Sequence, residues 1–102
     1  MNINELKSKI EQWANDRNII KGATTHAQFV KLIEETGELA AGIARSNEDL
    51  IKDSFGDVFV VLTILAAQCE VDLNECIELA YNEIKDRKGR MIDGCFVKEE
   101  DL

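Results

Sequence analysis

The sequence contains no proline in its 102 residues and only six glycines. Proline is the residue that most strongly interrupts a helix, because it lacks a backbone donor and its ring clashes with the preceding turn. A chain without it can form helices several turns long. Apolar residues make up 45% and charged residues 31%, as in globular and not in disordered proteins. We therefore expect an all-α fold, in a single domain over residues 1–102.

Apolar residues recur at helical spacing in four segments, so we expect four helices. The pattern places them at about residues 3–17, 25–45, 48–69 and 72–88. Thr25 and Gln28 have the spacing of a capping box at the start of the second helix, and Asn47 can cap the third. Periodicity is lost over residues 91–102, which we expect to form a tail or a short arm.

The second and third segments are apolar on more than one side. In the third, Val60, Val61 and Leu62 are followed closely by Ile64 and Leu65. A helix that is apolar on most faces requires neighbours on most faces. Four short helices in one chain do not supply them all, so we expect a homodimer or homotetramer that assembles through helical interfaces.

The formal net charge is −8. This charge repels a phosphate backbone, which argues against general binding to nucleic acid. The sequence has no long apolar stretch, so we expect neither a signal peptide nor a membrane span. The cysteines (Cys69, Cys76 and Cys95) are odd in number and lack C-x-x-C spacing, so we expect neither disulfides nor a zinc site, and a cytoplasmic location.

Three glutamates stand close together in the second predicted helix. Glu34 and Glu38 are four residues apart and Glu35 and Glu38 are three apart, so their carboxylates project from adjacent turns. Glu35 also lies between apolar residues, at the edge of the apolar stripe. Like charges at this spacing repel, and partial burial raises the free energy of ionisation. A hard cation with oxygen ligands would remove both penalties.

The third predicted helix repeats this arrangement. Asp53 and Asp57 are four residues apart, and Asp57 opens a long apolar run. Two antiparallel helices that carry acids at mid-length can converge on one cation. Oxygen ligands favour Mg²⁺, with Mn²⁺ as a substitute, over zinc or copper. The competing interpretation is a solvated acidic surface, which is the commoner origin of such patterns.

The two acidic segments, EETGEL at residues 34–39 and GDV at residues 56–58, resemble the E-E-x-x-E and E-x-x-D halves of a signature found in MazG-like all-α nucleotide pyrophosphohydrolases. The resemblance extends from Trp13 through the fourth predicted helix. Residues 81–91 are also similar to the small, single-domain members found in bacteria and phages.

This resemblance implies a four-helix bundle of the all-α NTP pyrophosphatase type. It further implies Mg²⁺-dependent cleavage of a nucleoside triphosphate, (d)NTP, to (d)NMP and pyrophosphate, which would remove unwanted nucleotides from the pool. Glu34, Glu35, Glu38 and Asp57 match acids of the signature and would ligate Mg²⁺, and one of the glutamates would orient or deprotonate water.

One position departs from the signature. The glutamate expected three residues before Asp57 is Ser54, and Asp53 stands one position earlier. Either Asp53 substitutes from the adjacent position, or the site has one ligand fewer and binds metal more weakly.

No glycine-rich phosphate loop is present, so basic side chains and metal would have to hold the phosphates. Lys31 stands one turn before the glutamates, and Lys85 and Arg87 end the fourth predicted helix beside Asn82. Trp13 could pack against the base. Trp13 and Phe29 lie on apolar stripes, however, which favours a place in the core for both.

Two other classes of function stay open. The chain could be a regulatory helical module that binds metal or nucleotide with weak or no catalysis, since Ser54 is the kind of change that degrades a site. It could also be an oligomerisation module with surface acids. Metal dependence separates the last class from the others, and product formation separates the first two.

Overall fold

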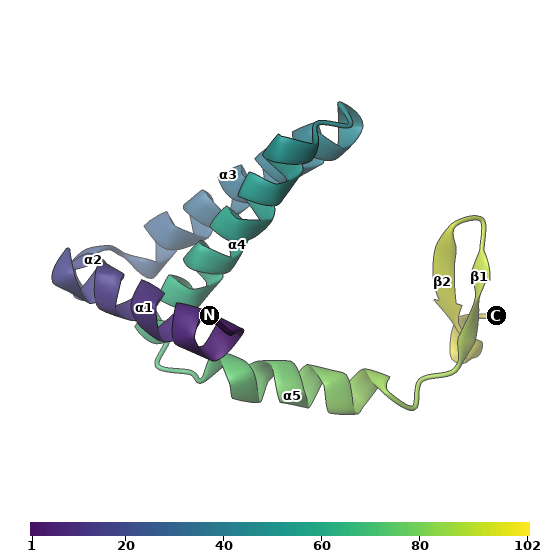
Figure 1. Ribbon diagram of the computed structural model, residues 1–102. Coiled ribbons are helices and arrows are strands. Elements are labelled where there is room, and N and C mark those ends of the chain that lie inside the picture. Colours follow the sequence, from purple (N-terminus) through teal and green to yellow (C-terminus); the bar gives the residue numbers. More distant parts are fainter. The chain divides into compact units, whose positions relative to one another are not determined.

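The computed structural model describes residues 1–102 and divides the chain into two compact units, Met1–Asp72 and Leu73–Leu102. Five α-helices make up most of the chain, which confirms the all-α class (Figure 1). The helices are α1 (Ile3–Asp16), α2 (Ile19–Gly22), α3 (Thr25–Ala44), α4 (Glu48–Gln68) and α5 (Leu73–Ile84). A four-helix bundle and a single domain stay predictions.

The first unit is organised around the antiparallel pair α3–α4. These two helices contact each other along their length, and α1 and α2 both contact α4 (Figure 1). A tight turn at residues 45–47 joins α3 to α4, with Ser46 in the left-handed region at φ 50°. Because the turn is short, residues equally far from it on the two helices lie opposite each other. This register brings the middle of α3 to the first half of α4.

Side-chain caps define the starts of the long helices. Asn47 Oδ1 accepts a hydrogen bond from the Leu50 amide at 3.1 Å, which confirms the predicted cap of α4. The predicted capping box of α3 is wrong by one residue. Thr24 is the cap, and its Oγ1 accepts from the Ala27 amide at 3.0 Å. Thr24 has the extended backbone that a cap requires, whereas Thr25 is already helical.

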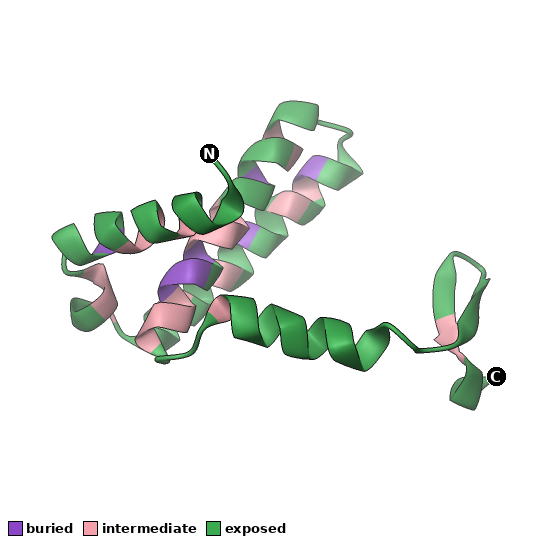
Figure 2. Ribbon diagram, turned by 60° about the horizontal axis from the view of Figure 1, so that its bottom comes forward, coloured by how far each residue is buried: buried purple, intermediate pink, exposed green.

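Small residues allow close helix packing in this unit. Ala14 and Ser54 are fully buried, and a Cβ added at Gly42 would lie only 3.2 Å from the backbone nitrogen of Ile51. The buried apolar side chains are few: Ala14, Val61 and Ile64. Most of the helical surface is exposed (Figure 2). The predicted core positions of Trp13 and Phe29 are wrong, since these residues are 45% and 52% exposed. The other elements of the first unit leave the apolar stripes that carry them partly uncovered.

The second unit joins α5 to a β-hairpin. Strands β1 (Gly89–Ile92) and β2 (Cys95–Lys98) are antiparallel, and a short 3₁₀ helix, η1 (Glu99–Asp101), follows. The two turn residues Asp93 and Gly94 both have positive φ, 51° and 82°, as a two-residue hairpin turn with the right twist requires. Residues 91–102, for which we predicted a tail or a short arm, contain most of this hairpin, because the Asp-Gly turn pairs two strands there.

The start of the hairpin also shortens the preceding helix. α5 ends at Ile84 and not near Lys88, because the Lys88 carbonyl accepts a hydrogen bond from the Glu99 amide at 2.8 Å. Gly89 must lack a side chain, since a Cβ there would overlap the Val97 carbonyl oxygen and the Phe96 ring. In neither unit is a helix both long enough and apolar enough to cross a bilayer.

Candidate functional site

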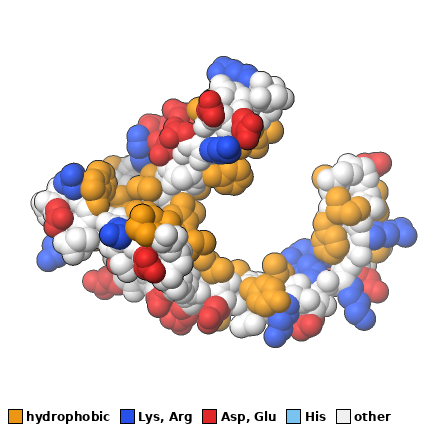
Figure 3. All heavy atoms as spheres, viewed as in Figure 1, with side chains coloured by type: hydrophobic (Ala, Val, Ile, Leu, Met, Phe, Trp, Pro, Cys, Tyr) orange, Lys and Arg blue, Asp and Glu red, His pale blue; other side chains and the backbone are white.

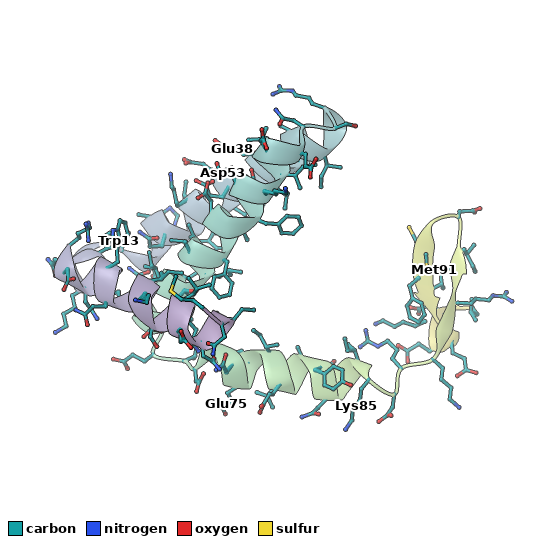
Figure 4. All side chains as sticks on the ribbon, viewed as in Figure 1. Trp13, Glu38, Asp53, Glu75, Lys85 and Met91 are labelled. Carbon is teal, nitrogen blue, oxygen red and sulfur yellow. The ribbon has the colours of Figure 1, made fainter.

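The predicted acids lie on the α3–α4 pair. α3 carries Glu34, Glu35 and Glu38, and α4 carries Asp53 and Asp57. Glu38 and Asp53 are at the same level of the pair in Figure 4, as the short connecting turn requires. Acidic side chains gather over this part of the surface in Figure 3. The register therefore presents acids from both helices in one region.

Glu35 is the most buried of these acids, with 7% of its surface exposed. One of its carboxylate oxygens, Oε1, lies 3.3 Å from the Lys31 ammonium group, one turn earlier on α3. The other oxygen, Oε2, is buried and has no hydrogen-bond partner. A buried carboxylate oxygen without a donor is unfavourable by a few kcal/mol in general. Glu35 thus offers an unsatisfied, negatively charged ligand atom.

The pKa of Asp57 depends on the acids around it. Burial raises the pKa of its carboxyl group above the ordinary value of 3.8, and the negative charges of Asp53 and Glu35 raise it further. A carboxylate affects another in this way only at short range. Glu35 from α3 and Asp53 and Asp57 from α4 therefore form one electrostatically coupled group, which we call the acidic cluster together with Glu34 and Glu38.

Ser54 lies within the same helix pair but faces away from solvent. It is fully buried, and its Oγ has no hydrogen-bond partner. A serine is small enough to let α3 and α4 approach each other at this point. Asp53, one position earlier, interacts electrostatically with Asp57. The acid that accompanies Asp57 on α4 is thus four residues away and not three.

The side chains of the acidic cluster are not arranged as a coordination sphere. No three His, Cys, Asp or Glu side chains are close enough together, as they stand, to hold one metal ion. Carboxylates one turn apart repel each other, and side-chain rotation separates them. The helices bring the acids to one region, and the side chains would have to turn inward to share a cation.

Lys31, the predicted phosphate-binding residue on α3, lies beside the acidic cluster. Its ammonium contacts Glu35, and hydrogen bonding to Glu35 followed by the charges of Glu35, Glu34 and Glu38 raises its pKa above 10.5. The lysine is therefore positively charged at any physiological pH.

Trp13 lines an apolar hollow of about 320 Å³ between α1 and α4. The Arg17 guanidinium lies over the Trp13 ring, 4.5 Å from the ring centre. Val60, one turn after Asp57, forms another wall. This hollow is absent from the sequence predictions, although the helical spacing of its α1 residues signals it: Leu6, Lys9, Ile10 and Trp13.

The other predicted substrate-binding residues belong to the second unit. Asn82 lies in α5, and Lys85 and Arg87 follow the end of this helix. Arg87 Nη2 lies 3.8 Å from Glu83 Oε1, and Arg87 lines a polar hollow of about 510 Å³. Acids outnumber bases in that lining, which does not suit a phosphate: Glu83, Asp86, Glu99 and Glu100 against Arg87, Lys88 and Lys98.

Comparison with known proteins points in one direction. The MazG nucleotide pyrophosphohydrolase domain matches residues 23–91 of the chain. A curated relative from Haemophilus phage HP1 (strain HP1c1), an uncharacterized 18.2 kDa protein in the rep-hol intergenic region, is 51% identical over 70 residues. That match covers 69% of this chain and 43% of the relative, so the chain spans less than half of the relative's length. No solved structure matches.

Proposed function

The chain belongs to the MazG nucleotide pyrophosphohydrolase family, and from this we propose that it hydrolyses nucleoside triphosphates to monophosphate and pyrophosphate with the help of Mg²⁺. The observation that carries the proposal is the acidic cluster on α3 and α4, which lies within the matched residues 23–91. We expect the substrate to come from the cytoplasmic nucleotide pool.

The residues of the cluster fit a hard divalent cation. They offer only carboxylate oxygens, which Mg²⁺ and Mn²⁺ prefer. Glu35 Oε2 is buried and unsatisfied, and the pKa of Asp57 is raised by burial and by neighbouring negative charge. A cation would relieve both conditions. Glu35, Glu38, Asp53 and Asp57 would hold it, and Glu34 would stand beside them.

Bound Mg²⁺ would neutralise phosphate charge and make water a better nucleophile toward the α phosphorus. The protein's own groups would orient the reactants. A glutamate of the cluster, Glu34, Glu35 or Glu38, would accept a hydrogen bond from the attacking water and take its proton. Asp53 would take the place of the signature glutamate, since it already interacts with Asp57 while Ser54 faces the helix interface.

Lys31 is the basic residue best placed to contact the phosphates, because it is on the same face of α3 as Glu35. The hollow beside Trp13 offers an apolar surface and a large aromatic ring to the nucleobase. Such stacking tolerates any base, which suits an enzyme that clears a range of unwanted (d)NTPs. Asn82, Lys85 and Arg87 stay candidates for further phosphate contacts.

Pyrophosphate release from a panel of (d)NTPs, measured with Mg²⁺ and with a chelator, tests the proposal. We expect monophosphate and pyrophosphate in equal amounts, and only with metal. Orthophosphate as the product would place the cleavage at a different bond. A folded sample that releases nothing from any nucleotide would contradict the proposal.

A second function is favoured by one observation. Ser54 supplies no carboxylate where the signature has one, and its hydroxyl is buried between the helices. A protein with one ligand fewer could bind metal and nucleotide as a regulatory module without turnover. Metal-dependent nucleotide binding without product formation would support this function.

A further inference from the structure

The ion pair between Lys31 and Glu35 is asymmetric. The Glu35 side chain is 10% exposed, whereas the Lys31 side chain is 54% exposed, and the two charged groups are 3.3 Å apart. The carboxylate is therefore fixed by its surroundings. The lysine reaches it from solvent on a flexible four-carbon chain, which can turn away with little rearrangement of the protein.

The Lys31 ammonium group pairs with an oxygen that could otherwise ligate a metal ion in the acidic cluster. It is paired with Glu35 Oε1, while Oε2 of the same carboxylate has no partner. A divalent cation on Glu35 and the Lys31 ammonium would repel each other, because like charges at about 3 Å interact unfavourably even in a polar environment. A divalent cation that takes both oxygens of Glu35 therefore competes with Lys31 for Oε1.

We propose that Lys31 is a built-in counter-ion of the acidic cluster, which the divalent cation displaces and thereby releases toward the phosphates of the substrate. This inference rests on the proposed function, since it requires the cluster to bind metal. It makes binding ordered: metal first, and then the nucleotide, which meets a lysine that is no longer paired.

The same chain contains a matched control. Lys52 and Glu48 also form an ion pair one turn apart, at 3.2 Å on α4, but both side chains are well exposed, by 72% and 79%. Lys52→Gln therefore removes the same charge and a similar ion pair without freeing an oxygen of Glu35. A comparison of Lys31→Gln with Lys52→Gln separates local competition from the general effect of net charge.

The first experiment is calorimetric titration of Mn²⁺ into the intact protein, without nucleotide. We expect Lys31→Gln to bind Mn²⁺ about fivefold more tightly than the unmodified protein, because no competing ion pair has to open. Lys52→Gln should stay within about twofold, and Lys31→Arg, which keeps the charge, should show no gain. Circular dichroism checks that each variant is folded.

The opposite results are equally informative. Weaker Mn²⁺ binding by Lys31→Gln would show that the lysine organises Glu35 for the metal, and unchanged binding would show that the two do not compete; either overturns the inference but leaves the proposed function intact. If the unmodified protein and all variants bind no Mn²⁺, the proposed function fails as well.

The second experiment measures binding of a non-hydrolysable α,β-methylene nucleoside triphosphate. The unmodified protein should bind it only with metal. At saturating Mn²⁺, Lys31→Gln should bind it about tenfold more weakly, although the same variant binds the metal more tightly. Equal affinity of both proteins for the analogue would overturn the release of Lys31 toward phosphate.

Discussion

At the scale of single residues, Asp57 carries a conflict between charge and burial. Burial first, and then Asp53 and Glu35, raise its pKa above 3.8. Between the ordinary and the raised pKa, the folded protein therefore binds more protons than the unfolded chain. The free energy of unfolding then falls as the pH rises through this interval, and the loss is complete above the raised pKa. Above the raised pKa, the ionised Asp57 opposes folding.

Replacement of this carboxyl group by an amide removes the conflict. We expect Asp57→Asn to be more stable than the unmodified protein at pH 7 in the presence of a chelator, and the difference to shrink as the pH falls toward 4. Thermal unfolding of both proteins across this range measures it. A difference that does not change with pH would show that the Asp57 carboxyl titrates normally.

The same substitution should be harmful to catalysis. We expect Glu38→Gln and Asp57→Asn each to lower the rate of pyrophosphate release by about 100-fold or more, because a metal site contributes several kcal/mol to transition-state stabilisation. Far-UV circular dichroism should show unchanged helicity. Glu48→Gln, at an exposed acid in the first turn of α4, serves as the control. Full activity of either site variant would refute the assigned site.

At the scale of secondary-structure elements, two glycines of α3 test how the helix pair packs. A Cβ at Gly37 would meet nothing within 4 Å, whereas one at Gly42 would lie 3.2 Å from both the backbone nitrogen and a side-chain carbon of Ile51. Both residues are inside the helix, where alanine is intrinsically more favourable by about 0.5–1 kcal/mol.

Gly37→Ala should therefore raise the free energy of unfolding by about 0.5–1 kcal/mol. Gly42→Ala should lower it by about 1–3 kcal/mol, since the α4 backbone must move to admit the methyl group. Urea denaturation of both variants provides the measurement. A stabilising Gly42→Ala would show that α3 and α4 are less tightly packed at this level than the structure has them.

Much of this architecture could be predicted from local signals. Asn47 followed by acids is a strong helix start and predicts the turn between the central helices, which places Glu38 and Asp53 at the same level of the pair. Loss of helical periodicity over residues 91–102 predicts only a tail or a short arm and does not by itself predict paired strands. The Asp93-Gly94 pair is the local signal for the hairpin turn.

The candidate site could be predicted only in part, for a physical reason. Helical spacing places Glu34, Glu35 and Glu38 on adjacent turns, but it does not determine which carboxylate is buried. The burial of Glu35 and its contact with Lys31 depend on how α3 packs against α4. The same holds for Ser54, whose buried position follows from the approach of the two helices and not from its neighbours in the sequence.

At the scale of the whole molecule, little apolar surface is buried within either unit. Three apolar residues are buried in the first unit, and no residue of the second unit is buried. Segments below about 40 residues rarely fold without further support, so residues 73–102 require another surface. The family match continues from residue 23 to 91, across the boundary between the units, and a single domain stays a prediction.

Exposed apolar residues on α3 and α4 point to a second copy of the chain as that surface. Phe55 and Leu62 are seven residues apart on one face of α4, and they are 60% and 36% exposed. On α3, Phe29, Val30 and Ile33 are exposed by 52%, 44% and 56%. Several large apolar side chains exposed on neighbouring helices are typical of an interface. A second copy of the chain would supply the helical neighbours that the apolar sequence of α4 requires.

We therefore expect a homodimer or homotetramer at micromolar concentration, and we expect Phe55→Gln with Leu62→Gln to shift it toward monomer by at least tenfold in dissociation constant. Each buried apolar side chain contributes roughly 1.5–3 kcal/mol, so the loss of two exceeds this factor. Light scattering after gel filtration measures the mass, and Lys52→Gln on the same helix is the control. An unchanged mass for the double variant would place the interface elsewhere. A monomeric, stably folded unmodified protein would contradict assembly altogether, and with it the reason for so apolar a helix α4.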